Sequence, residues 1–259
     1  MTAQIKLERE AHIAKLTISN PPANTWTLES LNQLKELAIE LSNDRSIYAL
    51  VLTGEGEKFF SAGADLNNFA SGDKSQAADM AFAFGEAFEA LTAFDGVSIA
   101  AINGYAMGGG LEVAMACDIR IAEEQVQMAL PEASVGLLPC AGGTQNLTAL
   151  VGEGWAKRMI LCGERVTAER AEKIGLVEEV VAKGQALEAA MELAQRVAGR
   201  QSPKSVSACK TLIQGRRSQT HVAGLVLERE LFLQLFNTQD QTEGVNAFLQ
   251  KRKPQWTNS

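Results

Sequence analysis

Two glutamates in apolar surroundings are the residues of this sequence best suited to acid–base chemistry. Glu112 follows three consecutive glycines within the long apolar run from Val97 to Asp118, and Glu132 ends the stretch Met128-Ala129-Leu130-Pro131-Glu132. Burial disfavours the charged form of a carboxyl group and raises its pKa, and a second carboxylate nearby acts in the same direction. Such a pair can hold and pass a proton near neutral pH.

The glycines before Glu112 predict a site for an anion. Gly108-Gly109-Gly110 opens a helix that we expect over about 111–117. The first N–H groups of a helix have no partner inside it, and the helix dipole favours negative charge there. This stretch alone also allows a second interpretation, in which the glycines only let a strand and a helix pack closely and Glu112 reaches solvent. The glycines and the acid argue against a membrane span.

A second loop of small residues, Ser61 to Leu66, follows an earlier predicted strand. Neighbouring parallel strands end side by side, and ligands bind at that edge of an open α/β sheet. The backbone N–H groups of Ala64 and Gly109 could then point at one oxygen, which is the layout of an oxyanion hole.

The elements that must position these groups alternate along the chain. Strands are predicted at 13–18, 48–53, 98–102, 118–122 and 178–181, and helices from Leu28, over 76–94 and 111–117, and then at 144–151, 154–161, 167–174, 185–198, 203–216 and 222–236. Strands that alternate with helices indicate βαβ units in a mainly parallel sheet. The chain after Thr144 turns largely helical, with more apolar helix surface than it can bury alone, so we expect oligomerisation.

Composition excludes several classes of function. The chain has 259 residues, 46% of them hydrophobic, and a net charge of −7, which suits a soluble globular protein and argues against nucleic acid as the main partner. No signal-peptide pattern opens the sequence, so we expect a cytoplasmic protein with no membrane partner. Four cysteines far apart suggest buried free thiols, and two isolated histidines offer few ligands for a metal, so no metal site is predicted.

Three segments together resemble the enoyl-CoA hydratase/isomerase, or crotonase, superfamily. They are the run I-A-A-I-N-G-Y-A-M-G-G-G-L-E-V-A-M-A-C-D-I from Ile99, the loop F-S-A-G-A-D-L from Phe60, and L-P-E-x-x-x-G-L-L-P-x-A-G-G-T-Q from Leu130. They occur in the order and spacing of that family, and the resemblance extends over the whole chain.

The resemblance implies an α/β fold built as a spiral of ββα turns, with a C-terminal helical region that forms trimers. We place the spiral core at residues 1–199 and the helical oligomerisation region at 200–259. A homotrimer, or a homohexamer made of two trimers, is implied. So is an acyl-CoA thioester substrate of fatty acid metabolism, whose carbonyl oxygen would lie between the N–H groups of Ala64 and Gly109.

Having both acids, the chain is most similar to the hydratases within the superfamily. On that pattern Glu112 helps to activate a water for attack at C3 of a trans-2-enoyl thioester and Glu132 delivers a proton to C2, although the two roles could be shared. No separate cofactor is implied, because CoA is part of the substrate. The resemblance places the CoA moiety along Ala62, Asp65 and Leu66, with Lys58 and Lys251 as candidates for its phosphates. An ordinary solvated charge is the alternative for each lysine.

Some positions depart from the common hydratase pattern. Ala129-Leu130 stands where Gly-Gln often precedes Pro-Glu, Cys140 replaces a frequent glycine, Asn146 replaces a frequent arginine, and Trp26-Thr27 is unlike the usual start of the first helix. Because both acids remain, we expect these changes to alter which acyl chains the protein prefers more than the type of reaction.

Four rival functions remain open. Three share the fold: a 3-enoyl-CoA to 2-enoyl-CoA isomerase that needs only Glu132, an acyl-CoA thioester hydrolase, and a non-catalytic acyl-CoA-binding member. A nicotinamide oxidoreductase is the fourth, and it is disfavoured because Gly104-x-Ala106-x-x-Gly109 is an incomplete dinucleotide-binding motif.

Overall fold

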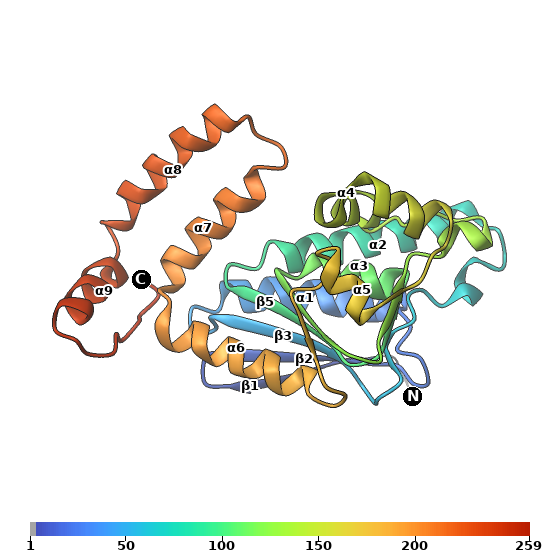
Figure 1. Cartoon of the computed structure of the whole chain (residues 1–259), viewed down its shortest axis with the longest axis horizontal. Coiled ribbons are helices and arrows are strands. Elements are labelled where there is room, and N and C mark those ends of the chain that lie inside the picture. Colours follow the sequence, from blue (N-terminus) through green and yellow to red (C-terminus); the bar gives the residue numbers. More distant parts are fainter. Residues whose placement is uncertain (1–3) are drawn as a thin grey trace.

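Two β-sheets form the centre of the protein in a computed structural model that describes residues 4–259 (Figure 1). The larger sheet has six strands in the order β1-β2-β3-β5-β7-β10. Their bounds are β1 Gln4–Glu10, β2 Ile13–Ser19, β3 Ala49–Gly54, β5 Val97–Ile102, β7 Ile119–Glu123 and β10 Glu179–Val181. All neighbours are parallel except the β1–β2 pair, so the predicted parallel sheet is confirmed.

The smaller sheet has four short strands in the order β4-β6-β8-β9. They are β4 Phe59–Ser61, β6 Tyr105–Met107, β8 Gln127–Ala129 and β9 Val166–Thr167, and only β9 is antiparallel to its neighbour. Sequence reasoning from the residues missed this sheet, because strands of two or three residues are too short to show an alternating pattern.

Successive turns of the chain pass through both sheets before entering a helix. The order is β3, β4, α2 (Lys74–Thr92), then β5, β6, α3 (Gly109–Ala116), then β7, β8, α4 (Gly143–Leu161). Each turn therefore has the ββα form that the family resemblance implied, and that prediction is confirmed.

Local sequence explains where the helices begin. Helix α1 (Leu28–Asn43) has Thr27 as its cap, and α7 (Pro203–Gly215) has Ser202 as cap with Pro203 in its first turn. The two helices expected over 144–161 are one element, α4, which is kinked at Gly152 with a φ of +78°. The remaining helices are the 3-10 turns η1 Leu66–Phe69 and η2 Glu132–Val135, with α5 Ala168–Lys173, α6 Ala186–Arg200, α8 His221–Leu235 and α9 Gln239–Leu249.

Two hydrophobic layers hold the large sheet between helices. One layer joins Val51 and Ile99 of the sheet to the alanines Ala186, Ala190 and Ala194 of α6. The larger core lies on the other side of the sheet and includes side chains of α1, α2 and α3. None of the helices among residues 4–259 is long and apolar enough to cross a membrane.

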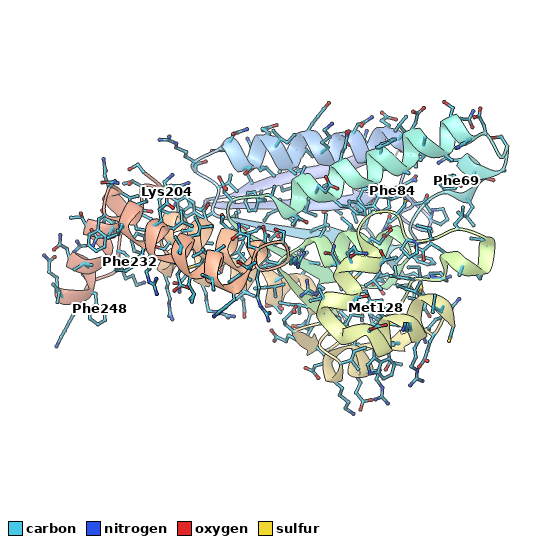
Figure 2. All side chains as sticks on the ribbon, turned by 90° about the horizontal axis from the view of Figure 1, so that it is seen from above. Phe69, Phe84, Met128, Lys204, Phe232 and Phe248 are labelled. Atoms are coloured by element: carbon cyan, nitrogen blue, oxygen red, sulfur yellow. The ribbon has the colours of Figure 1, made fainter. Side chains whose placement is uncertain are left out.

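The helices α7, α8 and α9 form an arm that extends from the core (Figures 1 and 2). Figure 2 shows Phe232 and Phe248 on this arm, at the end of the molecule opposite Phe69 and Phe84. Both arm phenylalanines are exposed, and no side chain of α8 is buried. The predicted excess of apolar helix surface is therefore present in this chain.

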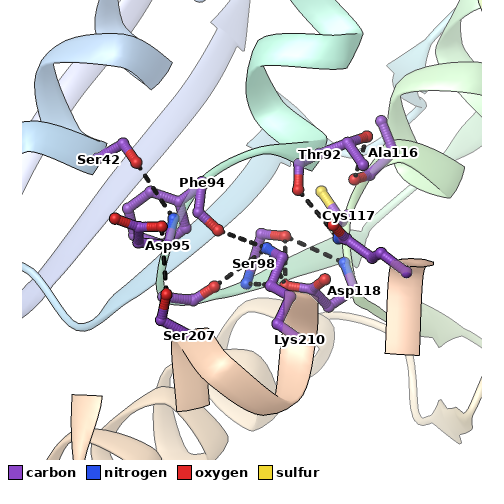
Figure 3. Close-up of polar contacts among 12 residues, drawn as sticks. Ser42, Thr92, Phe94, Asp95, Ser98, Ala116, Cys117, Asp118, Ser207 and Lys210 are labelled. Carbon is purple, nitrogen blue, oxygen red and sulfur yellow. Dashed lines mark hydrogen bonds and ion pairs between the residues drawn. The ribbon is translucent and has the colours of Figure 1, made fainter. Parts of the chain in front are cut away.

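An ion pair between two partly buried side chains attaches the arm to the core (Figure 3). Lys210 of α7 donates to Asp118 Oδ2 at 2.8 Å and to the carbonyl of Phe94 at 2.6 Å. Asp118 also accepts hydrogen bonds from the backbone and hydroxyl of Ser98. The arm therefore begins from a fixed position on the sheet.

The cysteines are free, as expected, but their burial was wrongly predicted. Cys117 alone among them is buried, whereas Cys140, Cys162 and Cys209 are exposed. The reason is that apolar neighbours in sequence do not fix which side of a loop or helix faces the core.

Candidate active site

The two predicted acids line one cavity of about 340 Å³. Glu112 lies in the first turn of α3 and is 3% exposed, and Glu132 is the first residue of η2, directly after β8 and Pro131. Ala64 and Gly109 line the same cavity. Four residues from three different turns of the spiral therefore meet at one place.

Close backbone packing brings the Ser61 loop against the start of α3. A Cβ atom on Gly110 would lie 2.1 Å from the carbonyl oxygen of Ser61, and one on Gly63 would lie 3.0 Å from the nitrogen of Gly109. Gly63 also has a φ of +88°. Only glycine meets these two demands without displacing the backbone.

The N–H groups of Ala64 and Gly109 are available for a ligand. Asp65 N–H donates to the carbonyl of Trp26 and Ala62 N–H to that of Ala23, whereas neither Ala64 nor Gly109 donates to another residue among 4–259. Gly109 is the first residue of α3, where a helix leaves its donors unpaired. These two donors are able to hold an oxygen that carries partial negative charge.

Backbone donors fix one oxygen of the buried Glu112. Its Oε1 accepts hydrogen bonds from the N–H groups of Ala141 and Gly143, both at 2.9 Å. Burial raises the pKa of Glu112, and the two hydrogen bonds partly oppose that shift because they stabilise the carboxylate. The two N–H groups therefore fix the orientation of the Glu112 carboxyl group and reduce the cost of its charged form.

The carboxyl group of Glu132 has a different environment. Its Oε2 is buried and has no hydrogen-bond partner among the residues that the structure describes. Burial raises the pKa of Glu132 to about 7, its own backbone N–H lowers it somewhat, and the charge of Glu112 raises it further. The two acids therefore differ: Glu112 is held by donors, and Glu132 has a free oxygen and a tendency to keep a proton.

Apolar side chains form much of the cavity wall. Phe84 comes from α2, and the other apolar side chains come from η1, η2 and the segments beside them: Leu66, Phe69, Leu137 and Leu138. Such a wall suits an acyl chain beside a few polar groups.

Cys140 also lines this cavity, a position that the sequence had marked only as a departure from the family pattern. Cys140 as a residue is exposed, but its thiol is partly desolvated in the cavity wall, and this desolvation, followed by the charge of Glu112, raises the pKa of the thiol to about 11. The group is therefore a neutral thiol at physiological pH, unsuited to nucleophilic attack.

The structure separates the other predicted residues into two groups. Ala62 and Leu66 line the cavity. Asp65 instead caps η1 by accepting the N–H of Asn67, and Lys58 is exposed with its Nζ 5.4 Å from the ring centre of Phe59. Lys251 follows the end of α9 on the arm, outside the residues that line the cavity.

Within the described part of the chain, no group of three histidine, cysteine or acidic residues is arranged to hold a metal ion. The polar groups that line the cavity include the carboxyl groups of Glu112 and Glu132 and the backbone of Ala64 and Gly109.

Comparison with known proteins gives consistent results along the whole chain. The profile of the family described as enoyl-CoA hydratase/isomerase matches residues 8–259. The 2,3-dehydroadipyl-CoA hydratase of Escherichia coli K12 is 39% identical over 257 residues, covering 97% of this chain and 98% of that protein. The short-chain-enoyl-CoA hydratase of Clostridium acetobutylicum is 36% identical, covering 95% of each. The solved structure of Pseudomonas aeruginosa DspI is 64% identical, with a TM-score of 0.96 and coverage of 98% of this chain and 97% of that one.

Proposed function

The chain belongs to the enoyl-CoA hydratase/isomerase family, and we propose that Glu112 and Glu132 carry out its reaction. As an enoyl-CoA hydratase it is a hydro-lyase that adds water across the 2,3 double bond of a trans-2-enoyl-CoA to give a 3-hydroxyacyl-CoA. The observation that carries this assignment is the shared cavity, in which both acids lie with Ala64 and Gly109.

The thioester carbonyl oxygen binds between the N–H groups of Ala64 and Gly109. Attack at C3 moves electrons onto this oxygen, so that an enolate develops where the two donors point. Each donor of this kind is typically worth roughly 2.7–4 kcal/mol of transition-state stabilisation. The absence of other acceptors for these two N–H groups among residues 4–259 supports the assignment.

The environments of the two acids support a division of their roles. Glu112, whose carboxylate form is stabilised by the N–H groups of Ala141 and Gly143, takes a proton from the water whose oxygen bonds to C3. Glu132, whose pKa is raised to about 7, gives its proton to C2 as the enolate collapses. One water is added in total, and transfer of the proton from Glu112 back to Glu132 through solvent restores the starting state.

The CoA moiety passes along the backbone of Ala62, Asp65 and Leu66, and Lys58 is placed for its phosphates. Lys251 belongs to the arm, so its contact with CoA would be made across a subunit interface. The exposed apolar side chains of the arm, Phe232 and Phe248 among them, support a trimer or a hexamer built from two trimers.

The test is hydration of crotonyl-CoA, followed as the loss of absorbance of the conjugated thioester. We expect turnover by the wild type and a loss of at least about a hundredfold in Glu132→Gln. The same preparation is assayed with a 3-enoyl-CoA for isomerisation and with acyl-CoA for thiol release. Isomerisation alone, surviving Glu112→Ala, would replace hydratase by isomerase, and thiol release alone would replace it by hydrolase.

A further inference from the structure

The two N–H groups that hold Glu112 belong to a turn at the start of α4. Gly142, the N-cap of this helix, has a φ of +87° and separates the two donors, Ala141 and Gly143, in sequence. A Cβ atom on Gly143 would lie 2.7 Å from Oε1 of Glu112, so the turn and the carboxyl group are in close contact. The position of this carboxyl oxygen therefore depends on how the turn is held.

Few hydrogen bonds hold the turn from outside α4. Among residues 4–259, two side chains of other elements bond to the segment 138–146, and they are those of Glu112 and Arg217. The backbone hydrogen bonds at the turn are local, because the carbonyl of Gly142 accepts two N–H groups from the first turn of α4. Since Glu112 is itself the group to be positioned, Arg217 is left as the external side chain that fixes the turn.

Arg217 reaches the turn through Asn146. Its Nη1 donates to Asn146 Oδ1 at 3.0 Å. The amide nitrogen of the same asparagine lies against Gly142, where a Cβ atom would be 2.9 Å from Nδ2. Asn146 therefore lies between the guanidinium group and the turn. Arginine is frequent at position 146 in the family pattern, and in this chain a guanidinium group is supplied there by a different element.

The place of Arg217 in the fold gives its guanidinium group a defined origin. Arg217 follows α7, and this helix is attached to the core at two earlier points. Lys210 donates to Asp118, and Gln214 donates to the carbonyl of Thr92 at 3.1 Å. The end of α7 is therefore fixed beside the start of α4, and the arm contacts the turn that holds Glu112.

We propose that Arg217 is a positioning residue for the hydration reaction, which holds the Glu112 carboxyl group in place through Asn146 and the turn. The inference rests on the proposed function, because it takes Glu112 to be the base. Misplacing a reacting group by about 1 Å can lower a rate by about a hundredfold. Loss of one hydrogen bond should relax the turn by less than this, so we expect an effect of about tenfold on kcat.

The experiment removes this hydrogen bond from either side. Arg217→Ala removes the donor, Arg217→Lys can still donate, and Asn146→Ala removes the acceptor while the positive charge stays. Arg216 is the exposed C-cap of α7 and makes no side-chain hydrogen bond or ion pair with residues 4–259, so Arg216→Ala is the matched control for lost charge. Each protein is assayed for kcat and KM with crotonyl-CoA over a range of pH, and thermal unfolding confirms that it is folded.

We expect Arg217→Ala and Asn146→Ala to lose about tenfold in kcat with KM within about twofold of wild type, because the turn contains neither donor to the thioester. Arg217→Lys and the control should keep kcat within about threefold. Adding Arg217→Ala to Asn146→Ala should lower kcat by less than about threefold more, since both remove the same contact.

The acidic limb of the kcat profile should move to higher pH in Arg217→Ala and in Asn146→Ala. The two N–H groups lower the pKa of Glu112, and a relaxed turn holds the charged form less well. The other titratable groups that line the cavity, Glu132 of η2 and Cys140 before α4, are the same in every variant.

Four results would overturn the proposal. They are a kcat of Arg217→Ala within about threefold of wild type, an equal loss in Arg217→Lys, a change in KM alone, and losses that multiply in the double variant. Absence of crotonyl-CoA hydration in the wild type would instead overturn the proposed function.

Discussion

Gly108 and Glu132 lie so close that a Cβ atom on Gly108 would be 3.0 Å from Oε1 of the glutamate. Gly108 is the N-cap of α3 and has a φ of +54°, a conformation that favours glycine. The carboxyl group of Glu132 is thus packed against backbone on one side, while its Oε2 has no hydrogen-bond partner among residues 4–259. This packing excludes water, which explains why its pKa is raised to about 7.

Replacing Glu132 should change how stability depends on pH. The pKa of Glu132 is about 7 in the folded protein against its usual 4.5, so between these values the folded protein keeps a proton that the unfolded chain has released. Its contribution to stability is therefore complete below pH 4.5 and is lost as pH rises through 7. Glu132→Gln stays neutral, so it should gain on the order of 2 kcal/mol relative to wild type between pH 5 and pH 8.5.

Urea unfolding of both proteins at the two pH values measures this change, and Glu153→Gln, at an exposed site on α4, is the control. A stability difference between wild type and Glu132→Gln that is the same at both pH values would contradict the raised pKa.

Two substitutions of Glu112 should separate its chemistry from its structural role. The amide of Glu112→Gln can still accept the N–H groups of Ala141 and Gly143, so we expect nearly unchanged stability and a loss of roughly 10²–10⁴ in kcat. Glu112→Ala leaves both donors buried without a partner, which costs about 1–3 kcal/mol for each. Crotonyl-CoA kinetics and urea unfolding check the two effects, and a Gln variant with activity within tenfold of wild type would exclude Glu112 as the base.

The position of the Gly109 N–H group should control the rate. A Cβ atom in Gly109→Ala would lie 2.7 Å from Phe84 Cε1, so the start of α3 or the ring must move. We expect kcat for crotonyl-CoA to fall by about 10²–10³ because the donor no longer points at the oxyanion. The control is Gly154→Ala on α4, where a Cβ atom meets nothing within 4 Å. Adding Phe84→Leu to Gly109→Ala should recover part of the rate, and failure of Gly109→Ala to alter kcat would remove this donor from the site.

The sequence was sufficient to predict the positions of the acids but not the geometry that joins them. Glu112 and Glu132 stand out as charged residues in apolar runs, and the glycines before Glu112 indicate a helix start. The residues alone suggested that the site lies at the ends of the large parallel strands. It lies instead after the short strands β4, β6 and β8, which are too short to give a periodic signal.

Other features depend on contacts between distant residues. The hydrogen bond from Arg217 to Asn146 joins positions 71 residues apart, and no local pattern in either segment points to the other. Cys140 could be recognised as unusual only by comparison with the family motif, and its place in the wall of the catalytic cavity follows from the tertiary packing of segments far apart in sequence. Local propensity fixes elements, whereas tertiary packing decides which of their side chains share a space.

The ion pair between Lys210 and Asp118 should hold the arm on the core. The Lys210 side chain is 11% exposed, and its Nζ also donates to the carbonyls of Phe94 and Gly96. Lys210→Met keeps much of the side-chain volume but leaves the Asp118 carboxylate without its cation, and removing one partner of a buried pair typically costs about 3–5 kcal/mol. Asp118 is 23% exposed and keeps its hydrogen bonds from Ser98, so we expect the lower end of that range.

A double variant tests whether the two side chains act as a pair. Asp118→Asn alone should also destabilise the protein. Lys210→Met combined with Asp118→Asn should lose less stability than the sum of the two single variants, because no charge is then left unpaired. Lys204→Met, also on α7, is the matched control, because no carboxylate of residues 4–259 lies within ion-pair distance of Lys204. Urea unfolding of the four variants measures the coupling, and additive losses would show that the pair does not anchor the arm.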